Sequence, residues 1–131
     1  MQYLLDTNIC IYIFKGMFNL DKKLSEIGLS NFAISEITYA ELIYGAEKSE
    51  QKAKNFALIE EFSNQIPILP IFNGIKVFAK EKVKLQKSGR TISDFDLLIG
   101  ATAIANNMIM VTRNIKEFNR MENIKLENWV E

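Results

Sequence analysis

The stretch YLLDTNICIYIF, from Tyr3 to Phe14, places an aspartate directly after a short apolar run. Residues 2–5 (QYLL) have the composition of a buried strand, and residues 7–14 (TNICIYIF) are predicted to form the helix that follows it, so Asp6 stands at the junction of the two. In parallel sheets, ligands gather beyond the carboxyl ends of the strands. We therefore predict that Asp6 faces a site at that edge of a sheet and not the hydrophobic core.

The same alternation of strand and helix continues along the chain. Further strands are predicted at residues 31–35, 66–70, 108–112 and 124–129, and further helices at residues 19–28, 36–49, 51–65, 74–89 and 93–107. Strands that alternate with helices favour a parallel sheet covered on both faces. With 131 residues, 48% of them hydrophobic, we expect one α/β domain that spans residues 1–131.

Three of the predicted helices have informative apolar patterns. Helix 93–107 is apolar nearly all round and is expected to be buried, with Gly100, Ala101 and Ala103 permitting a close approach of the backbone. Helix 36–49 carries one helical face formed by Ile37, Ala40, Glu41 and Tyr44. Helix 74–89 has an apolar face formed by Ile75, Phe78, Ala79 and Val83. The carboxylate of Glu41 on an otherwise apolar face is unusual.

Composition excludes several classes of chemistry. The chain has no histidine, so nucleophilic schemes and RNA cleavage that depend on a histidine are excluded. Its single cysteine, Cys10, excludes an internal disulfide and a cysteine-rich zinc site. The formal net charge is zero, so a polyanion would have to be held by a local patch. No signal peptide is evident and no apolar run is long enough to span a bilayer, so we expect a cytoplasmic protein with no membrane contact.

Several acidic residues stand where a metal ion would explain them. Glu41 lies on its apolar helical face and Asp96 precedes the apolar run LLIGATAIA, so both are expected to be partly buried. Partly buried carboxylates repel one another unless a cation compensates them. With no histidine and one cysteine, oxygen ligands suit Mg²⁺ or Mn²⁺. Such an ion would position a phosphodiester and activate a water molecule.

Each of these acids also has a structural explanation. Asp6 stands at an N-cap position, Thr38–Glu41 and Ser93–Asp96 fit the capping-box pattern, and Asn114–Glu117 fits it as well. The capping explanation is weaker for Glu41, because Ser35 already supplies a helix start. The capping role and the functional role do not exclude each other at these positions.

Four segments in order resemble the PIN-domain ribonucleases, specifically the VapC toxins of bacterial toxin-antitoxin pairs. They are LLDTNICIYI (4–13), ITYAELIYGAEKS (37–49), GRTISDFDLLIGATAIA (89–105) and VTRNIKEFNRMENIKLENW (111–129). The resemblance implies a PIN-like three-layer sandwich with a central, mainly parallel sheet flanked by helices. It also implies Mg²⁺- or Mn²⁺-dependent endonucleolytic cleavage of RNA, such as transfer RNA or ribosomal RNA, with 5′-phosphate and 3′-hydroxyl ends. The implied partners are a VapB antitoxin and a second copy of the chain in a homodimer.

The resemblance implies which acids hold the metal. The first acid of the family matches Asp6, the helix acid matches Glu41, and the aspartate before LLIGATA matches Asp96. At the fourth position many PIN domains have an aspartate where this chain has Asn114, and the glutamate three residues later matches Glu117. Glu117 is then a catalytic or second-metal residue and Asn114 a supporting one, which leaves one metal ion or two open.

Further residues are expected to support the site or to contact RNA. By the resemblance, Thr7 and Asn8 orient Asp6, and Thr112 donates a hydrogen bond into the acid cluster or is an ordinary residue at a strand end. Asp94 is interpreted as a first-turn helix charge, with a smaller chance that it is the ligand in place of Asp96. The candidate RNA contacts are Arg90, Arg113 and, from the lysine stripe of Lys76, Lys80, Lys84 and Lys87, its last three members. The stripe also suits an ordinary solvated helix face.

Two other functions remain open from the sequence. A Mg²⁺-binding receiver module is also α/β with an aspartate at a strand end, but it requires an acidic pair after the first strand and a lysine after a late strand. LLDTN lacks that pair and VTRN offers an arginine. A catalytically weak PIN-like module that only binds RNA or a partner protein is the second alternative, and Asn114 at the fourth acidic position keeps it open.

Overall fold

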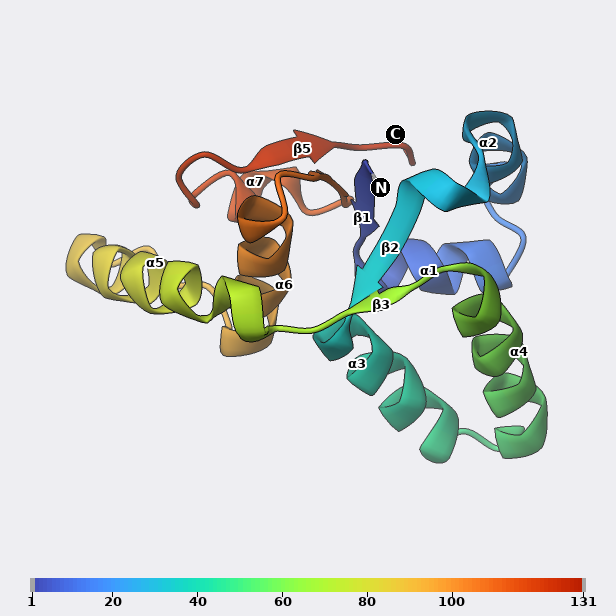
Figure 1. The fold of residues 1–131 in the computed structure, drawn as a ribbon. Helices are drawn as coiled ribbons and strands as arrows, with labels where there is room; N and C mark the ends of the chain where they lie inside the picture. Colours follow the sequence, from blue (N-terminus) through green and yellow to red (C-terminus); the bar gives the residue numbers. More distant parts are fainter. Residues whose placement is uncertain (1, 131) are drawn as a thin grey trace.

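The computed structural model describes residues 2–130, with a five-stranded sheet at the centre (Figure 1). The strands are β1 (Tyr3–Leu5), β2 (Phe32–Ser35), β3 (Ile68–Leu69), β4 (Ile109–Val111) and β5 (Lys125–Glu127). They lie in the order β3-β2-β1-β4-β5, and each neighbouring pair is parallel. The predicted parallel α/β sheet is confirmed, and all five strands fall within the predicted segments.

Helices fill the connections between the strands. They are α1 (Thr7–Phe14), α2 (Leu20–Ile27), α3 (Glu36–Glu47), α4 (Lys52–Gln65), α5 (Ile75–Ser88), α6 (Asp94–Ala105) and α7 (Ile115–Phe118), with short 3₁₀ turns η1 (Leu29–Asn31) and η2 (Phe72–Gly74). Helix α1 has the predicted bounds. Helix α7 was not predicted, because a helix of four residues is too short to show an apolar period. Among residues 2–130, none of the helices combines the length and apolar character needed to cross a bilayer.

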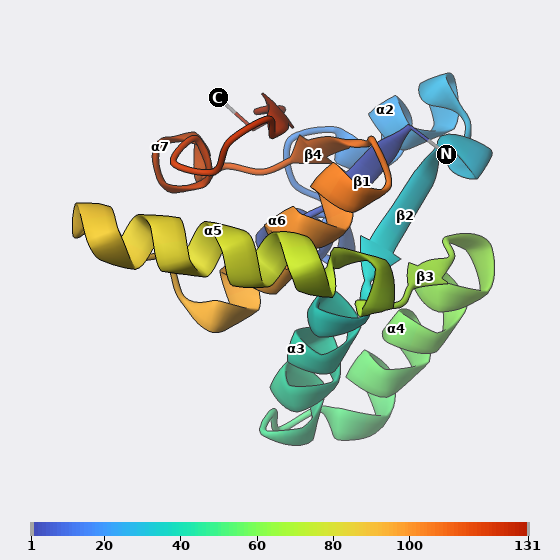
Figure 2. The same ribbon diagram turned by 60° about the vertical axis from the view of Figure 1, so that its left-hand side comes forward.

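The alternation of side chains along each strand divides the core into two layers. Leu5, Ile34 and Val111 point into one layer, whereas their neighbours Leu4, Ala33 and Met110 point into the other. Helices α1 to α4 cover the first layer, and α5 and α6 cover the second, as the views in Figures 1 and 2 show. The three-layer sandwich expected from the sequence is therefore present.

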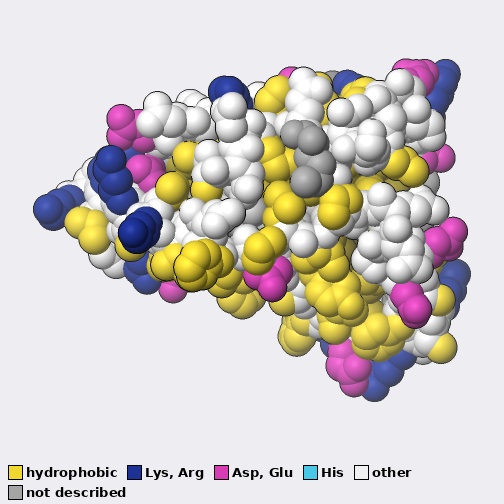
Figure 3. All heavy atoms as spheres, viewed as in Figure 1, with side chains coloured by type: hydrophobic (Ala, Val, Ile, Leu, Met, Phe, Trp, Pro, Cys, Tyr) yellow, Lys and Arg dark blue, Asp and Glu magenta, His cyan; other side chains and the backbone are white. Residues whose placement is uncertain are grey.

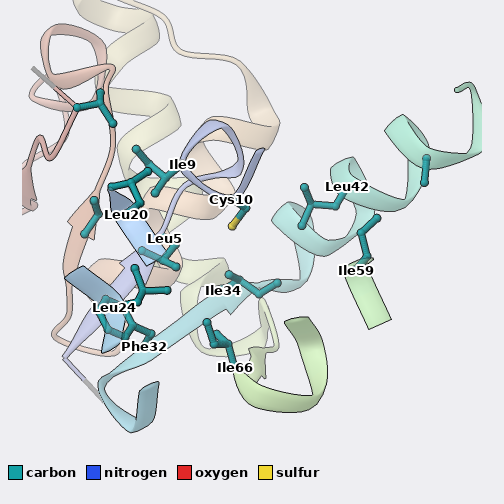
Figure 4. Close-up of a cluster of buried hydrophobic side chains, with 13 residues drawn as sticks. Leu5, Ile9, Cys10, Leu20, Leu24, Phe32, Ile34, Leu42, Ile59 and Ile66 are labelled. Carbon is teal, nitrogen blue, oxygen red and sulfur yellow. The ribbon is translucent and has the colours of Figure 1, made fainter. Parts of the chain in front are cut away.

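The first layer is a continuous cluster of aliphatic side chains (Figure 4). Leu5 of β1, Ile9 of α1 and Ile34 of β2 are fully buried, and Cys10 packs among them as a small apolar side chain. Burial of each such aliphatic side chain contributes about 1.5–3 kcal/mol. This cluster fixes helix α1 against the strand that precedes it and thereby fixes the junction occupied by Asp6.

Helix α6 is buried on almost every side, as predicted. Leu97 to Ala103 are buried with the exception of Leu98, which is half-buried. A Cβ atom added to Gly100 would lie 2.5 Å from the Met121 sulfur, so any larger residue would require the Met121 side chain to move. The close packing holds the first turn of α6 at a fixed position relative to the sheet.

Two predicted helix faces were wrong. The buried side of α3 is formed by Thr38, Leu42 and Ala46, while Ala40 and Tyr44 are exposed, because α1 and α4 pack against the Leu42 side.

The predicted apolar face of α5 is mostly exposed as well. Ile75, Ala79 and Val83 lie on the surface, and α6 packs against the side of α5 that contains Glu81 and Leu85. The apolar pattern misled here because the buried side of α5 includes a charged residue.

Candidate acidic active site

Asp6 lies at the carboxyl edge of the sheet, where β1 and β4 end side by side. Leu5 is in register with Val111, and the Asp6 amide donates to the Val111 carbonyl at 3.0 Å. One carboxylate oxygen of Asp6 accepts the Thr7 amide at 2.8 Å, which caps α1, and the other accepts the Thr112 hydroxyl at 2.8 Å. Asp6 therefore has both roles that its position suggested: it caps a helix, and it faces the edge of the sheet.

Glu41 reaches this edge from helix α3. Ser35 caps α3 by accepting the amides of Ile37 and Thr38, which leaves Glu41 inside the helix. The Thr7 hydroxyl donates to Glu41 Oε1 at 2.6 Å and lies 3.1 Å from the Thr38 hydroxyl. Thr7 thus connects Glu41 of α3 to the helix that Asp6 caps.

Asp96 is held in the first turn of helix α6. Its amide donates to the Ser93 hydroxyl at 3.3 Å, so Ser93 is the N-cap. Its side chain is half-buried and lies close enough to Glu117 for the two carboxyl groups to influence each other. Asp94, two residues earlier, pairs instead with Lys82 at 2.8 Å. The turn therefore directs Asp96, and not Asp94, toward the other acids.

Glu117 stands in helix α7, just beyond β4. The Asn114 side-chain amide donates to Glu117 Oε2 at 2.8 Å, and the Asn114 backbone amide donates to the Thr112 hydroxyl at 3.0 Å. Asn114 does not cap α7 with its side chain. Asn114 therefore positions Glu117, and through Thr112 the same turn is tied to Asp6.

The charges of these acids act on one another. Burial raises the pKa of Asp6, the hydrogen bonds from Thr112 and Thr7 lower it, and the negative charges of Glu41 and Glu117 raise it further. Burial raises the pKa of Asp96 to about 6, with additional increases from the charges of Asp6 and Glu117. Each of these two aspartates is therefore harder to ionise because other carboxylates are near it.

Within residues 2–130, none of the ion pairs includes Asp6, Glu41, Asp96 or Glu117. In the same part of the chain, no three acidic side chains already form a ready-made metal-binding group. Glu41 and Glu117 are instead turned toward Thr7 and Asn114. Carboxylate oxygens that repel one another and have no cationic side chain among them are the donor set that a hard divalent cation fits.

Of the predicted supporting residues, Thr7, Thr112 and Asn114 contact the acids directly. Asn8 is exposed, and within the described part of the chain its side chain makes no hydrogen bond to Asp6. The residue that sequence reasoning missed is Thr38, which is fully buried beside the Thr7 hydroxyl. Its signal was a threonine three residues before Glu41, on the same side of α3, which we interpreted only as a possible cap.

The predicted basic residues lie in different environments. Lys84 lies 3.1 Å from both Glu81 and Glu122, so it belongs to a surface ion-pair network and not to a free stripe. Lys80, Lys87 and Arg90 are exposed on or just after α5. Figure 3 shows Lys and Arg side chains gathered at the end of the molecule where α5 lies in Figure 1. Arg113 follows Thr112 directly, and its Nη1 donates to the Tyr12 hydroxyl at 2.8 Å.

A cavity of about 510 Å³ opens next to the acidic site, between helices α1, α3 and α4. Glu41 stands on its wall, the floor includes Leu42, Ala46 and Ile59, and Lys15 and Lys54 also line it. The cavity is therefore apolar at the bottom and carries charges of both signs in its lining.

Comparison with known proteins gives the class to which this fold and site belong. The family model for the PIN domain matches residues 3–124, and the chain belongs to the PIN-domain family. Its relatives are VapC ribonucleases: the chain is 39% identical to ribonuclease VapC2 of Haemophilus influenzae over 99% of both chains. It is 33% identical to the tRNA(fMet)-specific endonuclease VapC of Shigella flexneri over 98% of both.

The fold agrees with solved structures of this class. The chain superposes on a chain in the crystal structure of VapBC2 from Rickettsia felis, bound to a DNA fragment from their promoter, with a TM-score of 0.90 and 37% identity. The match covers 98% of this chain and 99% of that one. The resemblance to the VapC toxins that the sequence motifs suggested is thereby confirmed.

Proposed function

We propose that this protein is an endoribonuclease of the VapC type, the toxin of a toxin-antitoxin pair that acts in the cytoplasm. The observation that carries the proposal is the gathering of Asp6, Glu41, Asp96 and Glu117 at one sheet edge, with no cationic side chain paired to any of them among residues 2–130. The names of the relatives support RNA as the substrate, and that of the Shigella flexneri relative favours a transfer RNA.

The acids would hold Mg²⁺ or Mn²⁺. Asp6, Glu41 and Asp96 are the proposed ligands, and Glu117 is either a further ligand or a residue that orients one. When bound, the divalent ion supplies positive charge to the phosphoryl group and lowers the pKa of water. The chain's own hydroxyls fix the geometry: Thr112 holds one oxygen of Asp6, and Thr7 holds Glu41. Because Asn114 donates to Glu117, it directs that carboxylate toward Asp96.

RNA binding requires local positive charge, because the net charge of the chain is zero. Arg113 is the proposed basic contact nearest to the acids, since it follows Thr112. Lys80, Lys87 and Arg90 are proposed contacts for the backbone at a greater distance. Lys84 is a weaker candidate, because its pairing with Glu81 and Glu122 raises the cost of moving it to a phosphate.

A VapB-type antitoxin is the proposed protein partner, since the Rickettsia felis structure is of a VapBC2 complex. The cavity between α1, α3 and α4 is the surface proposed for it. Apolar grooves of this kind bind an amphipathic helix through a few buried side chains. A segment that filled the cavity would lie against Glu41 and would hinder access of RNA to the acids.

We propose that the homodimer forms through exposed apolar residues of α5, away from the cavity. Ile75 and Val83 are exposed along α5, where the sequence pattern had predicted burial for both. Val83→Asp is expected to shift the protein to a monomer in light scattering after gel filtration. Unchanged mass in that variant would contradict this surface.

The test of the proposed function is cleavage of cellular RNA after brief expression of the protein, followed by mapping of the new ends. We expect cuts that require a divalent ion, leave 5′-phosphate and 3′-hydroxyl ends, and disappear with Asp6→Ala. In vitro, Asp96→Asn must remove cutting while the circular dichroism spectrum is unchanged. RNA binding without cutting by the wild-type protein would favour the binding-module alternative, and acetyl-phosphate-dependent modification of Asp6 would favour a receiver module.

A further inference from the structure

An aromatic pair lies at the end of α1, the helix that Asp6 caps, and Tyr12 of this pair is not among the residues that line the cavity. The rings of Tyr12 and Phe18 meet edge to face, with centroids 5.2 Å apart. Phe18 is 43% exposed, and Tyr12 is half-buried. Ile11 and Phe14 line the cavity, whereas the Tyr12 hydroxyl is bound by Arg113. Helix α1 therefore presents aliphatic and aromatic side chains to the cavity, and an aromatic hydroxyl paired with an arginine elsewhere on its surface.

The turn after α1 holds Phe18 outward. Phe18 and Asn19 both have positive φ, 59° and 54°, which is uncommon for residues other than glycine. On one side the Met17 amide donates to the Tyr12 carbonyl at 2.9 Å, and on the other Leu20 is buried in the core. Because both ends of the turn are fixed, the Phe18 ring is kept at the surface beside Tyr12.

Arg113 joins this pair to the acidic site. Its guanidinium carbon lies 5.8 Å from the centre of the Tyr12 ring, and Nη1 donates to the Tyr12 hydroxyl. The preceding residue, Thr112, donates to Asp6. A ligand that reached Asp6 with a phosphate would therefore have its next groups beside the guanidinium and the two rings.

We propose that Phe18, Tyr12 and Arg113 form a stacking platform for an unpaired nucleobase of the RNA that the acidic site cleaves. The inference rests on the proposed ribonuclease activity and adds how the RNA is held. Aromatic rings and arginine guanidinium groups are the side chains on which splayed-out bases stack. The base must be unpaired, because a base inside a duplex does not expose its face. The preferred substrate is therefore a single-stranded loop or end.

The platform favours RNA over a protein segment for a physical reason. A protein helix seeks a concave apolar groove, and that groove lies on the Ile11 and Phe14 side of α1. The platform instead combines an exposed aromatic ring with a cationic guanidinium, which suits a flat aromatic ring attached to a phosphate. Contact with the antitoxin is the outcome that competes with this inference.

The test compares two labelled RNA probes of equal charge on the full chain with Asp96→Asn, which keeps the RNA intact. One probe is a short oligoadenylate, and the other is a ribose-phosphate strand of the same length without bases. Phe18→Leu should weaken binding of the oligoadenylate about fivefold to tenfold, the lower range for loss of one stacked base. Binding of the abasic strand should not change, and Phe18→Tyr should restore the affinity for oligoadenylate.

The matched control is Phe72→Leu, which changes the same residue type at a position that is 78% exposed and lies in η2. It should leave both affinities unchanged, and thermal melting should show that both leucine variants are folded. Equal affinity of Phe18→Leu and the parent for oligoadenylate would overturn the inference, and so would an equal loss for both probes. Weaker capture of the cognate antitoxin by Phe18→Leu, with RNA binding intact, would assign the surface to the protein partner and overturn it too.

The wild-type chain, assayed in parallel for cutting, separates this inference from the proposed function. Selective loss of oligoadenylate binding in Phe18→Leu, together with no cutting by the wild type, would support the platform and contradict the nuclease. Cutting by the wild type with no selective loss would contradict the platform alone.

Discussion

Among residues 2–130, two carboxylates are almost fully buried, and their surroundings differ in one respect. Glu81 of α5 is 4% exposed and Asp6 is 6% exposed. Glu81 lies 3.1 Å from the Lys84 ammonium and accepts the Glu122 amide at 2.8 Å. Asp6 accepts a hydroxyl and an amide, but the charged groups that influence it are the carboxylates of Glu41 and Glu117.

The difference separates a structural carboxylate from a functional one. A buried negative charge is costly unless an opposite charge or several hydrogen bonds compensate it. Glu81 finds its cation within the chain and ties α5 to the turn after α7. Asp6 is influenced by carboxylates of its own sign, which is why we propose that a bound divalent ion compensates it. The same reasoning supports the proposal of Asp96 as a metal ligand, whereas Asp94 pairs with Lys82 at the surface.

The largest predicted effect comes from removing one acid of the cluster to which Asp6 belongs. Asp96→Asn should lower the rate of RNA cleavage by about a thousandfold, since loss of one group that stabilises developing charge already costs about 10²–10³. Glu81→Gln, the same chemical change at the other kind of carboxylate, should leave the rate per folded molecule unchanged. Single-turnover cleavage of a defined RNA measures both, and equal losses in the two variants would contradict the distinction.

A smaller loss is predicted from the hydroxyl that holds Asp6. Thr112→Val keeps the size of the side chain but removes the hydrogen bond at 2.8 Å, and we expect cleavage to fall by about 10- to 100-fold, as for groups that orient metal ligands. Thr102→Val is the control, because the Thr102 hydroxyl bonds only to the backbone of its own helix. Weaker Mn²⁺ affinity should accompany the loss in Thr112→Val.

The structural role of Glu81 is tested by the free energy of unfolding of a variant that lacks its carboxylate. Glu81→Ala leaves the Glu122 amide without its acceptor and Lys84 with one partner instead of two, so the free energy of unfolding should fall by about 1–3 kcal/mol. Urea denaturation measures it. Glu26→Ala, at an exposed pair with Lys22, should change stability far less. If Glu81→Ala kept the wild-type free energy of unfolding, the contacts of Glu81 with Lys84 and the Glu122 amide would not stabilise the fold.

The smallest predicted effect is a pH dependence of the free energy of unfolding, caused by Asp96. Burial and neighbouring charge raise the pKa of Asp96 from 3.8 to about 6, so the folded state holds a proton that the unfolded state releases in this window. Without divalent ions, ionised Asp96 therefore destabilises the fold above about pH 6, and stability is regained as the pH falls toward 4.

Asp96→Asn lacks this titration, because the amide resembles the protonated acid. In EDTA the variant should be more stable than the wild type at pH 7, and the difference should shrink at pH 5. Urea unfolding of both proteins at the two pH values measures it. If the stability difference between the variant and the wild type grew as the pH fell, the predicted direction of the Asp96 effect would be contradicted.

The sequence was sufficient for the order of elements, while the catalytic and metal-binding roles of the acids stay predictions. Alternating apolar runs located every strand, and the position of Asp6 after β1 indicated the edge where the acids meet. Prediction failed where the tertiary context decides which face of a helix is buried. Ile75, Ala79 and Val83 have the spacing of a core face, but α6 packs on the side that carries Glu81. Although Lys84 stands three residues after Glu81, no local pattern reveals the Glu122 amide that also compensates that charge.

The parts of the site that sequence could not supply are contacts between distant residues. The pairing of Arg113 with Tyr12 joins residues 101 positions apart, and the contact of Thr38 with Thr7 joins residues 31 apart. Neither has a signature along the chain. Both follow from the parallel register that brings the ends of β1, β2 and β4 together.

The most direct test of the account is a crystal structure of the protein grown with excess Mn²⁺. We predict an anomalous peak at the carboxyl edge of the sheet, with oxygens of Asp6 and Asp96 bound to it and the Glu41 and Glu117 side chains turned toward it. Strong Mn²⁺ peaks elsewhere, with these carboxylates still engaged only with Thr7, Thr112 and Asn114, would contradict it.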